Sequence, residues 1–237
     1  GAGQKVSKAS TPVGTLADGL KGYWSFDGGD TNWTTNTVTD KSGNGNTGTL
    51  TNMSTSTSPT AGKIGQGLNF VAANSQYVDL GTSSTIRPGV NVSFTASLWY
   101  KGAGTGTKYF ISAPTGLSQG FWFVSESGTT FYNSTESSLG TVVTYTLPND
   151  NEWHNIVVTL DRSTSPDMVT AYVDGVSQGS ATELMDGGSA GGTGNTRIGR
   201  GYWGDANAYR QGPMDDVRIY NRALSASEVK QLYNLGK

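Results

Sequence analysis

The sequence contains no cysteine, a single histidine and few charged residues. Without cysteine the chain can form neither a disulfide framework nor a thiolate metal site, and one histidine cannot build a multi-histidine site. Charged residues make up 14% of the chain and leave a formal net charge of −2, so the basic stripe that nucleic-acid binding needs is missing. No stretch approaches the roughly 20 apolar residues of a membrane-spanning helix. We therefore expect no nucleic-acid partner and no membrane span.

Glycine, serine, threonine and asparagine are abundant instead. The 237 residues include 34 glycines, while hydrophobic residues reach 34%, which is enough for a folded protein with a polar surface. A sandwich or barrel often uses this length as one domain. Low charge with this composition is typical of a bacterial extracellular module, which predicts an extracellular or cell-surface location.

Short segments in which apolar and polar residues alternate run through most of the chain, as in residues 92–101. Turn-forming clusters separate them at short intervals, which is typical of an all-β sandwich. The pair Asp174-Gly175 predicts a tight hairpin turn. Residues 1–18 show no such pattern and are predicted to be a flexible linker or arm, so the folded domain is predicted to span residues 19–237.

The end of the chain breaks this rhythm with a helical pattern. Ser225 can cap a helix while Glu228, three residues on, reaches back, which is the spacing of a capping box. Leu224 before the cap and Val229 in the first turn match a hydrophobic staple. The pattern predicts one short helix of roughly two to three turns near 225–233.

Eight segments follow one another along the chain: "GYWSFDG", "DKSGNGNTGTL", "GKIGQGLNF", "QYVDL", "FTASLWYK", "EWHNIVVTLD", "AYVDG" and "MDDVRIYNRALSASEVKQLY". Taken in order, these segments resemble the bacterial form of the laminin-G-like jelly roll, the concanavalin A-like lectin/glucanase fold. The resemblance implies two stacked antiparallel sheets with one concave face and with the last strand beside the first. It implies that the helix seals the seam between those strands, and that Trp24, Trp99 and Trp153 are core residues.

The sequence does not favour an enzyme. Glucanases of this fold carry an E-x-D-x-E or E-x-D-x-x-E strand, and this chain has neither. Asp215 and Asp216 cannot form a facing pair, because neighbours on a strand point to opposite faces. His154 has no obvious acid partner and is interpreted as part of the scaffold. The glutamates are isolated and are interpreted as solvated side chains: Glu126, Glu136, Glu152, Glu183 and Glu228.

Oxygen-bearing side chains cluster where the first and last strands are expected to meet. Similar jelly rolls often hold a structural Ca²⁺ near their paired ends, and calcium prefers carboxylate, amide and backbone oxygens. The candidate ligands are Asp27, Asp40, Asn46 and Asp215. The alternative is that Asp40 and Asn46 make Asx turns and that Asp215 anchors a loop by hydrogen bonds.

A loop before the last strand combines aromatic and polar side chains. Sugar rings stack their C–H faces on aromatic rings, while amide, carboxylate and guanidinium groups hydrogen-bond sugar hydroxyls. The predicted platform is Tyr202, Trp203 and Tyr209, and the predicted polar partners are Arg200, Asp205 and Asn207. The alternative is that these aromatic residues fold back as a lid over the edge of the sandwich.

Three functions are compatible with these features. The first is a noncatalytic extracellular carbohydrate-binding or adhesion module of a bacterial surface protein, with a glycan or cell-surface polysaccharide as partner. The second is a structural subunit of a surface appendage, which self-associates when residues 1–18 add a strand to a neighbour. The third, a glycoside hydrolase, lacks the two placed carboxylates that hydrolysis requires.

Overall fold

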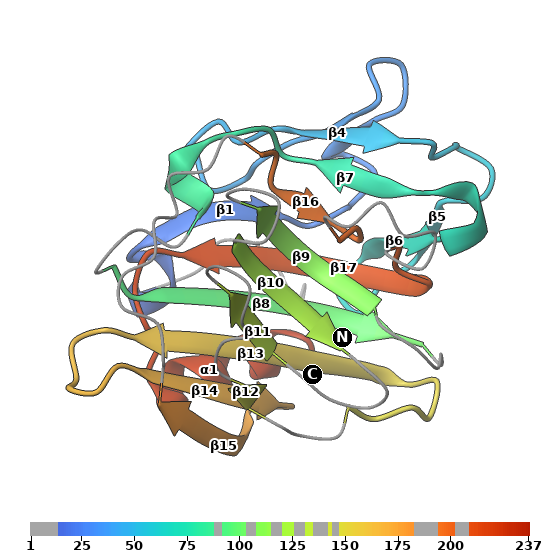
Figure 1. Cartoon of the computed structure of the whole chain (residues 1–237). Coiled ribbons are helices and arrows are strands. Elements are labelled where there is room, and N and C mark those ends of the chain that lie inside the picture. The colour runs from blue at the N-terminus through green and yellow to red at the C-terminus, as the bar shows by residue number, and fades with distance from the viewer. Residues whose placement is uncertain are drawn as a thin grey trace, which may run out of the picture.

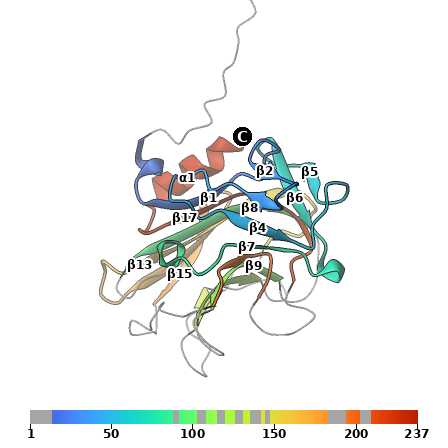
Figure 2. The ribbon, with the colours of Figure 1, turned by 90° about the horizontal axis from the view of Figure 1, so that it is seen from above.

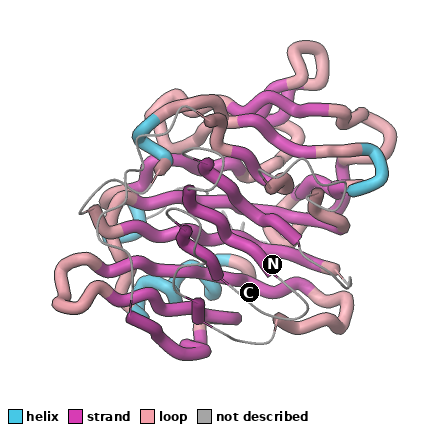
Figure 3. The backbone as a smooth tube through the Cα atoms, in the orientation of Figure 1, coloured by secondary structure: helices cyan, strands magenta, loops and turns pink. Residues whose placement is uncertain are grey.

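The computed structural model describes residues 14–87, 92–102, 108–114, 120–125, 131–134, 142–143, 147–182, 194–201 and 209–237. Strands dominate this part of the chain and form two antiparallel sheets (Figure 1, Figure 3). Figure 2 shows the two sheets as stacked layers. The prediction of an all-β jelly-roll sandwich with a C-terminal helix is confirmed.

In the described part of the chain, one sheet has eight strands in the order β15-β14-β13-β8-β17-β6-β5, with β1 also paired to β17. Its strands are β1 (Leu20–Trp24), β5 (Pro59–Ala61), β6 (Gln66–Phe70), β8 (Phe94–Lys101), β13 (Trp153–Asp161), β14 (Met168–Val173), β15 (Val176–Thr182) and β17 (Gly212–Tyr220). We call it the eight-stranded sheet. The pairing of β1 with β17 places the last strand beside the first, as the resemblance implied.

The second sheet has nine strands among the described residues, in the order β12-β11-β10-β9-β16-β7-β4-β3-β2. Its strands are β2 (Thr31–Asn32), β3 (Thr37–Val38), β4 (Gly48–Thr51), β7 (Tyr77–Asp79), β9 (Lys108–Pro114), β10 (Gly120–Ser125), β11 (Phe131–Ser134), β12 (Val142–Val143) and β16 (Arg197–Ile198). We call it the nine-stranded sheet. Short 3₁₀ helices η1 (Gly14–Ala17), η2 (Ala72–Asn74) and η3 (Ser84–Ile86) complete the described elements together with α1 (Ala226–Leu235).

The main core lies between the two sheets and follows the alternation read from the sequence. On β8, Phe94, Ala96, Leu98 and Tyr100 enter this core, where they meet residues such as Ile111 from the nine-stranded sheet. Successive strand residues point to opposite faces, so the intervening side chains of β8 lie on the outer face. Those side chains are buried as well, which means that a second layer covers this face.

That second layer is the C-terminal helix. In Figure 2, α1 lies beyond β17, on the side away from β7 and β9. The predicted capping box is present: Ser225 Oγ accepts the Glu228 N–H, and the Glu228 carboxylate accepts the Ser225 N–H at 2.9 Å. The Arg222 guanidinium lowers the pKa of Glu228 to about 2, so this glutamate is an ion-paired cap and not the solvated side chain expected.

The helix covers a face of the sheet, a different role from the edge seal expected for it. Its buried apolar side chains, with Leu224 before it, form a second hydrophobic cluster on the outer face of the eight-stranded sheet. The members of this cluster are Leu16, Val157, Tyr172, Tyr220, Leu224, Val229 and Leu232. Because Leu16 belongs to the cluster, the folded domain includes residues 14–17, earlier than the predicted boundary at residue 18. Residues 1–13 of the predicted linker lie outside the described residues.

The tryptophans predicted for the core are distributed over three environments. Trp24 is buried between the sheets, and its indole N–H donates to the Asn46 carbonyl at 2.9 Å. Trp99 is equally buried but lies on the outer face, where it stacks on Tyr233 of α1 with ring centroids 5.7 Å apart. Trp153 is only half-buried. The core assignment therefore holds for Trp24, holds for Trp99 through the helix, and fails for Trp153.

Replacing Leu232 by Ala should lower the free energy of unfolding by about 2–4 kcal/mol, because Leu232 is 2% exposed and its removal leaves a cavity under the helix. Urea denaturation measures this change. Gln231→Ala, one position earlier on the exposed face of α1, is the matched control and should stay within about 0.5 kcal/mol of the wild type. Equal midpoints for the two variants would contradict the packing described.

Candidate functional site

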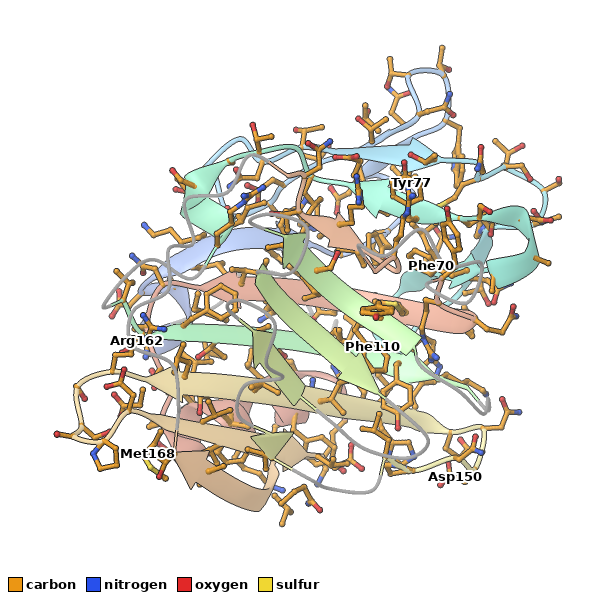
Figure 4. The ribbon with its side chains drawn as sticks, viewed as in Figure 1. Phe70, Tyr77, Phe110, Asp150, Arg162 and Met168 are labelled. Carbon is orange, nitrogen blue, oxygen red and sulfur yellow. The ribbon has the colours of Figure 1, made fainter. Side chains whose placement is uncertain are left out.

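The candidate ligand site lies on the outer face of the nine-stranded sheet, where β7 pairs with β16. Val78 pairs with Ile198, and both side chains are completely buried in the core between the sheets. Because strand residues alternate between faces, Tyr77, Asp79 and Arg197 must point away from that core. All three are partly exposed. Figure 4 shows Tyr77 on β7.

The segment after β16 carries Arg200 to the same place. Ser112 Oγ on β9 donates to the Arg200 carbonyl at 2.7 Å, and an isolated β-bridge joins Arg200 to Tyr209. The Gly199 N–H donates to the Phe110 carbonyl at 2.8 Å, which ties the segment to β9 once more. These backbone contacts hold the Arg200 side chain beside the β7–β16 pair.

Arg200 lies between two tyrosine rings. Its Cζ atom is 4.9 Å from the ring centroid of Tyr77 and 5.2 Å from that of Tyr209, both within cation–π range. The two rings are 6.3 Å apart and inclined by 45°. Arg197 approaches the ring of Tyr77 as well, with its Cζ 5.9 Å from the centroid. We call Tyr77, Arg197, Arg200 and Tyr209 the arginine–tyrosine patch.

Asp79 borders the patch but is already engaged. Both of its carboxylate oxygens accept N–H groups of the Asn195 side chain, at 2.8 and 2.9 Å, and Oδ1 also accepts the Gly81 N–H at 2.8 Å. Arg197 Nε lies 3.9 Å from Asp79 Oδ2, which is an ion-pair distance but too long for a hydrogen bond. The Asp79 carboxylate therefore hydrogen-bonds Asn195 and Gly81, and it forms only a long ion pair with Arg197.

Two of the six predicted glycan-site residues, Arg200 and Tyr209, come together in this patch. Tyr202, Trp203, Asp205 and Asn207 lie outside the described residues, so their part in the site stays a prediction, as does the alternative of a lid. Tyr77 and Arg197 were not predicted from the sequence to belong to a ligand site. The alternation in "QYVDL" could have placed Tyr77 on the outer face, but nothing local joins it to residue 200.

Arg210, from the same loop, has a different environment. It is 4% exposed, and its guanidinium lies 4.9 Å from the ring centroid of Phe110 and 5.5 Å from that of Tyr100. Burial lowers the pKa of Arg210 to about 10, while the nearby Tyr100 acts in the opposite direction. Arg210 is therefore a buried cation stacked between aromatic rings and not a surface contact.

The four predicted calcium ligands form two separate hydrogen-bonded groups. In the first, Asp40 Oδ1 accepts the N–H groups of Tyr23 and Ser42, and Oδ2 accepts the Asn46 N–H, all at 2.9 Å. The Asn46 side-chain oxygen accepts a hydrogen bond from Thr85 at 3.2 Å. These contacts are the Asx-turn arrangement given as the alternative, and they leave Asp40 little capacity for a metal ion.

In the second group, Asp27 and Asp215 hold the same turn, residues 62–66. Asp27 Oδ1 accepts the Gln66 N–H at 2.9 Å, and Asp215 Oδ2 accepts the Ile64 N–H at 2.8 Å. The turn lies so close that a Cβ atom on Gly65 would clash with the Asp27 carboxylate. Asp215 thus anchors a loop, as the alternative interpretation stated.

One carboxyl oxygen of Asp215 remains unpaired. Its side chain is fully buried, and Oδ1 has no hydrogen-bond partner. Burial raises the pKa of Asp215 to about 8, and the adjacent Asp216 carboxylate adds to this rise. Within the described residues, no three His, Cys, Asp or Glu side chains gather into a group that could hold a metal ion. Calcium binding by Asp27, Asp40, Asn46 and Asp215 stays a prediction, and Asp27 and Asp215 are the two of these residues that hold one turn together.

His154 has two acid partners, so the expectation that it has none is wrong. Its Nδ1 lies 2.8 Å from Asp174 Oδ2 and its Nε2 lies 3.0 Å from Asp150 Oδ1. Asp174 opens the predicted hairpin turn between β14 and β15, which is present with positive φ at Asp174 and Gly175. The histidine therefore ties this turn to the loop before β13, which agrees with a role in the scaffold.

The described residues contain no helix long and apolar enough to cross a membrane. A family model described as the concanavalin A-like lectin/glucanases superfamily matches residues 72–230. No curated protein sequence matches the chain. Several solved structures do match it over most of its length.

The binding domain of Paraclostridial Mosquitocidal Protein 1 has a TM-score of 0.71 at 17% identity, over 93% of this chain and 53% of that one. Domain 4 of AbnA, a GH43 extracellular arabinanase from Geobacillus stearothermophilus, was solved with arabinotriose; it has a TM-score of 0.63 at 21% identity, over 92% and 98%. The binding domain of botulinum neurotoxin DC, solved in complex with SialylT, has a TM-score of 0.62 at 12% identity, over 94% and 53%. The chain spans about half the length of the two toxin domains, and identities this low show a shared fold alone.

Calcium stays a proposal in a narrower form, in which Asp215 Oδ1 and the Asp27 carboxylate hold one structural ion. At a hundredfold excess over its dissociation constant, the ion should stabilise the fold by about 2.7 kcal/mol. Thermal melting in CaCl₂ and in EGTA measures this difference, which Asp215→Asn should remove and Asp40→Asn should not. Identical melting of metal-free wild-type protein in both solutions would contradict calcium binding.

His154 should make stability depend on pH. Burial lowers its pKa, but Asp174 and Asp150 outweigh this and raise it above the usual value. A raised folded-state pKa stabilises the protein fully below about pH 6.5, and this stabilisation is lost as the pH rises through the folded-state pKa. The unfolding free energy of the wild type, minus that of His154→Gln, should therefore fall as the pH rises above about 6.5. If the unfolding free energies of the two proteins changed in parallel with pH, the ion pairs of His154 would contribute nothing to stability.

Proposed function

The chain belongs to the concanavalin A-like lectin/glucanases superfamily, and we propose that it is a noncatalytic carbohydrate-binding module of an extracellular or cell-surface protein. Its partner would be a glycan or a cell-surface polysaccharide. The observation that carries the proposal is the arginine–tyrosine patch. Polar and aromatic groups converge there on one outer face of the sandwich.

The chemistry of the patch suits a sugar. Tyr77 offers an aromatic face to the C–H groups of a pyranose or furanose ring, and its phenol can hydrogen-bond a hydroxyl. The guanidinium groups of Arg197 and Arg200 supply further N–H donors, while their contacts with the ring of Tyr77 keep them in place. A few oriented polar groups beside an apolar platform are the usual composition of a ligand site.

The same geometry favours binding over hydrolysis. Glycoside hydrolysis needs two carboxyl groups that flank the scissile bond, one of them free to protonate the leaving oxygen. Among the described residues, Asp79 is the carboxylate that borders the patch, and its oxygens already accept hydrogen bonds from Asn195 and Gly81. A sugar bound on Tyr77 would thus contact the aromatic ring and the N–H donors of the arginines. The Asp79 carboxylate would remain hydrogen-bonded to Asn195 and Gly81.

The similar structures support the proposal at the level of the fold. One of them is an arabinanase domain solved with arabinotriose, and another is a toxin binding domain solved with SialylT. Both structures share the sandwich fold with this chain, although the match to the toxin domain covers 53% of that chain. Tyr202, Trp203, Asp205 and Asn207 would extend the proposed site from the loop before Tyr209.

A glycan array followed by calorimetric titration tests the proposal. A site with one platform should bind weakly, with dissociation constants in roughly the micromolar to millimolar range. Tyr77→Ala should weaken binding at least about tenfold, the equivalent of about 1.4 kcal/mol, while the melting temperature stays nearly unchanged. Tyr233→Ala is the matched control, since Tyr233 is a half-buried tyrosine against the opposite sheet, on α1.

Three results would contradict the proposal. The first is the absence of binding to any glycan on the array. The second is equal affinity of the wild type and Tyr77→Ala, which would place the ligand elsewhere. The third is release of reducing sugar from a bound oligosaccharide by the wild type, because it would make the domain a hydrolase.

A further inference from the structure

Among the described residues, the arginine–tyrosine patch carries more positive charge than its neighbours neutralise. Arg197 and Arg200 contribute two guanidinium groups, and Asp79 is the described carboxylate beside them. The Asp79 carboxylate accepts hydrogen bonds from Asn195 and Gly81, and its Oδ2 lies 3.9 Å from Arg197 Nε. In the part of the chain that the structure describes, Arg200 has no carboxylate within ion-pair distance. This positive excess stands on a protein whose net charge is −2.

The two arginines are also incompletely hydrogen-bonded. Nε of Arg197 and Nε of Arg200 are both buried without a hydrogen-bond partner. No described residue accepts a hydrogen bond from the terminal nitrogens of either side chain. A buried donor without an acceptor costs free energy, and an arginine has five N–H groups to satisfy. The contacts with the rings of Tyr77 and Tyr209 position the guanidinium groups and leave these N–H groups unused.

We propose that the ligand of this patch is an acidic glycan whose anionic group, a carboxylate or a sulfate, binds between Arg197 and Arg200 while its sugar ring lies on Tyr77. This inference rests on the proposed function and names its ligand class. A planar guanidinium fork pairs with two oxygens of one anionic group, and such charge-assisted hydrogen bonds are about twice as strong as neutral ones. A neutral sugar would not neutralise the positive charge of Arg197 and Arg200 and would not form charge-assisted hydrogen bonds with their N–H groups.

The proposal predicts discrimination between sugars that differ only in charge. Trigalacturonic acid and its fully methyl-esterified form share their rings and hydroxyls, but only the acid can pair with the arginines. The full chain should bind the acid at least about tenfold more tightly than the ester. Its affinity for the acid should fall with added NaCl, whereas its affinity for the ester should not. A sulfated galactose oligosaccharide, compared with its unsulfated form, shows which anion the patch prefers.

Single substitutions locate the effect. Arg200→Gln and Arg197→Gln should each reduce the preference for the acid over the ester, while affinity for the ester changes little. Arg162→Gln is the control, since Arg162 pairs with Asp167 in the turn after β13 and lies far from Tyr77 (Figure 4). Melting curves of all three variants check that they are folded. The comparison of the acid with the ester is made on the wild-type protein, so its result does not depend on the folding of a variant.

The outcomes separate this inference from the proposed function. Equal affinity for charged and neutral members of both pairs, lost in Tyr77→Ala, would overturn the acidic ligand and leave a carbohydrate-binding module. A preference for acid that survives both arginine substitutions would overturn the assigned residues. Failure of every probe and of the glycan array would overturn the proposed function together with the inference.

Discussion

The pairing of β7 with β16 is the contact on which the candidate site depends. Val78 and Ile198 are buried on the core side of this pair, so their neighbours Tyr77 and Arg197 are forced onto the outer face. A register slip by one residue would move the apolar side chains to water and the polar ones into the core, which makes the register costly to change. The same hydrophobic burial that stabilises the sandwich therefore places an arginine beside a tyrosine more than 100 positions away in the sequence. Backbone contacts to β9 then bring Arg200 over the pair.

The two sheets use their outer faces differently. Helix α1 and the second hydrophobic cluster cover the outer face of the eight-stranded sheet, so that β8 is buried on both sides and Trp99 is shielded by Tyr233. This face contributes to stability. The nine-stranded sheet keeps partly exposed aromatic and cationic side chains on its outer face at β7 and β16. A sheet whose central strand β8 is buried on both faces thus packs against the sheet whose outer face carries the arginine–tyrosine patch.

Features set by neighbouring residues could be predicted from the sequence. The capping box at Ser225 and Glu228, the Asp174-Gly175 turn and the alternation of β8 are all local, and each is present. Contacts between distant strands could not be predicted in this way. Tyr77 was missed because only the β7–β16 pairing joins it to Arg200, and the acid partners of His154 were missed because Asp174 approaches it across the β13–β14 hairpin. The division of the predicted calcium ligands into two groups has a related cause: the Asn46 N–H donates to Asp40 within one loop, whereas Asp27 and Asp215 meet at a turn between β5 and β6.

The central proposal is that a glycan binds on the outer face of the nine-stranded sheet at β7 and β16. Nuclear magnetic resonance of the isotopically labelled chain, titrated with an oligosaccharide that it binds, tests this most directly because it reports the position of the ligand. The account predicts that the largest amide shifts fall on residues 77–79, 195–201 and 209, with the arginine side-chain Nε–H signals of Arg197 and Arg200 moving as well. Shifts confined to β13–β15 or to α1, with residues 77–79 and 195–201 unchanged, would contradict it.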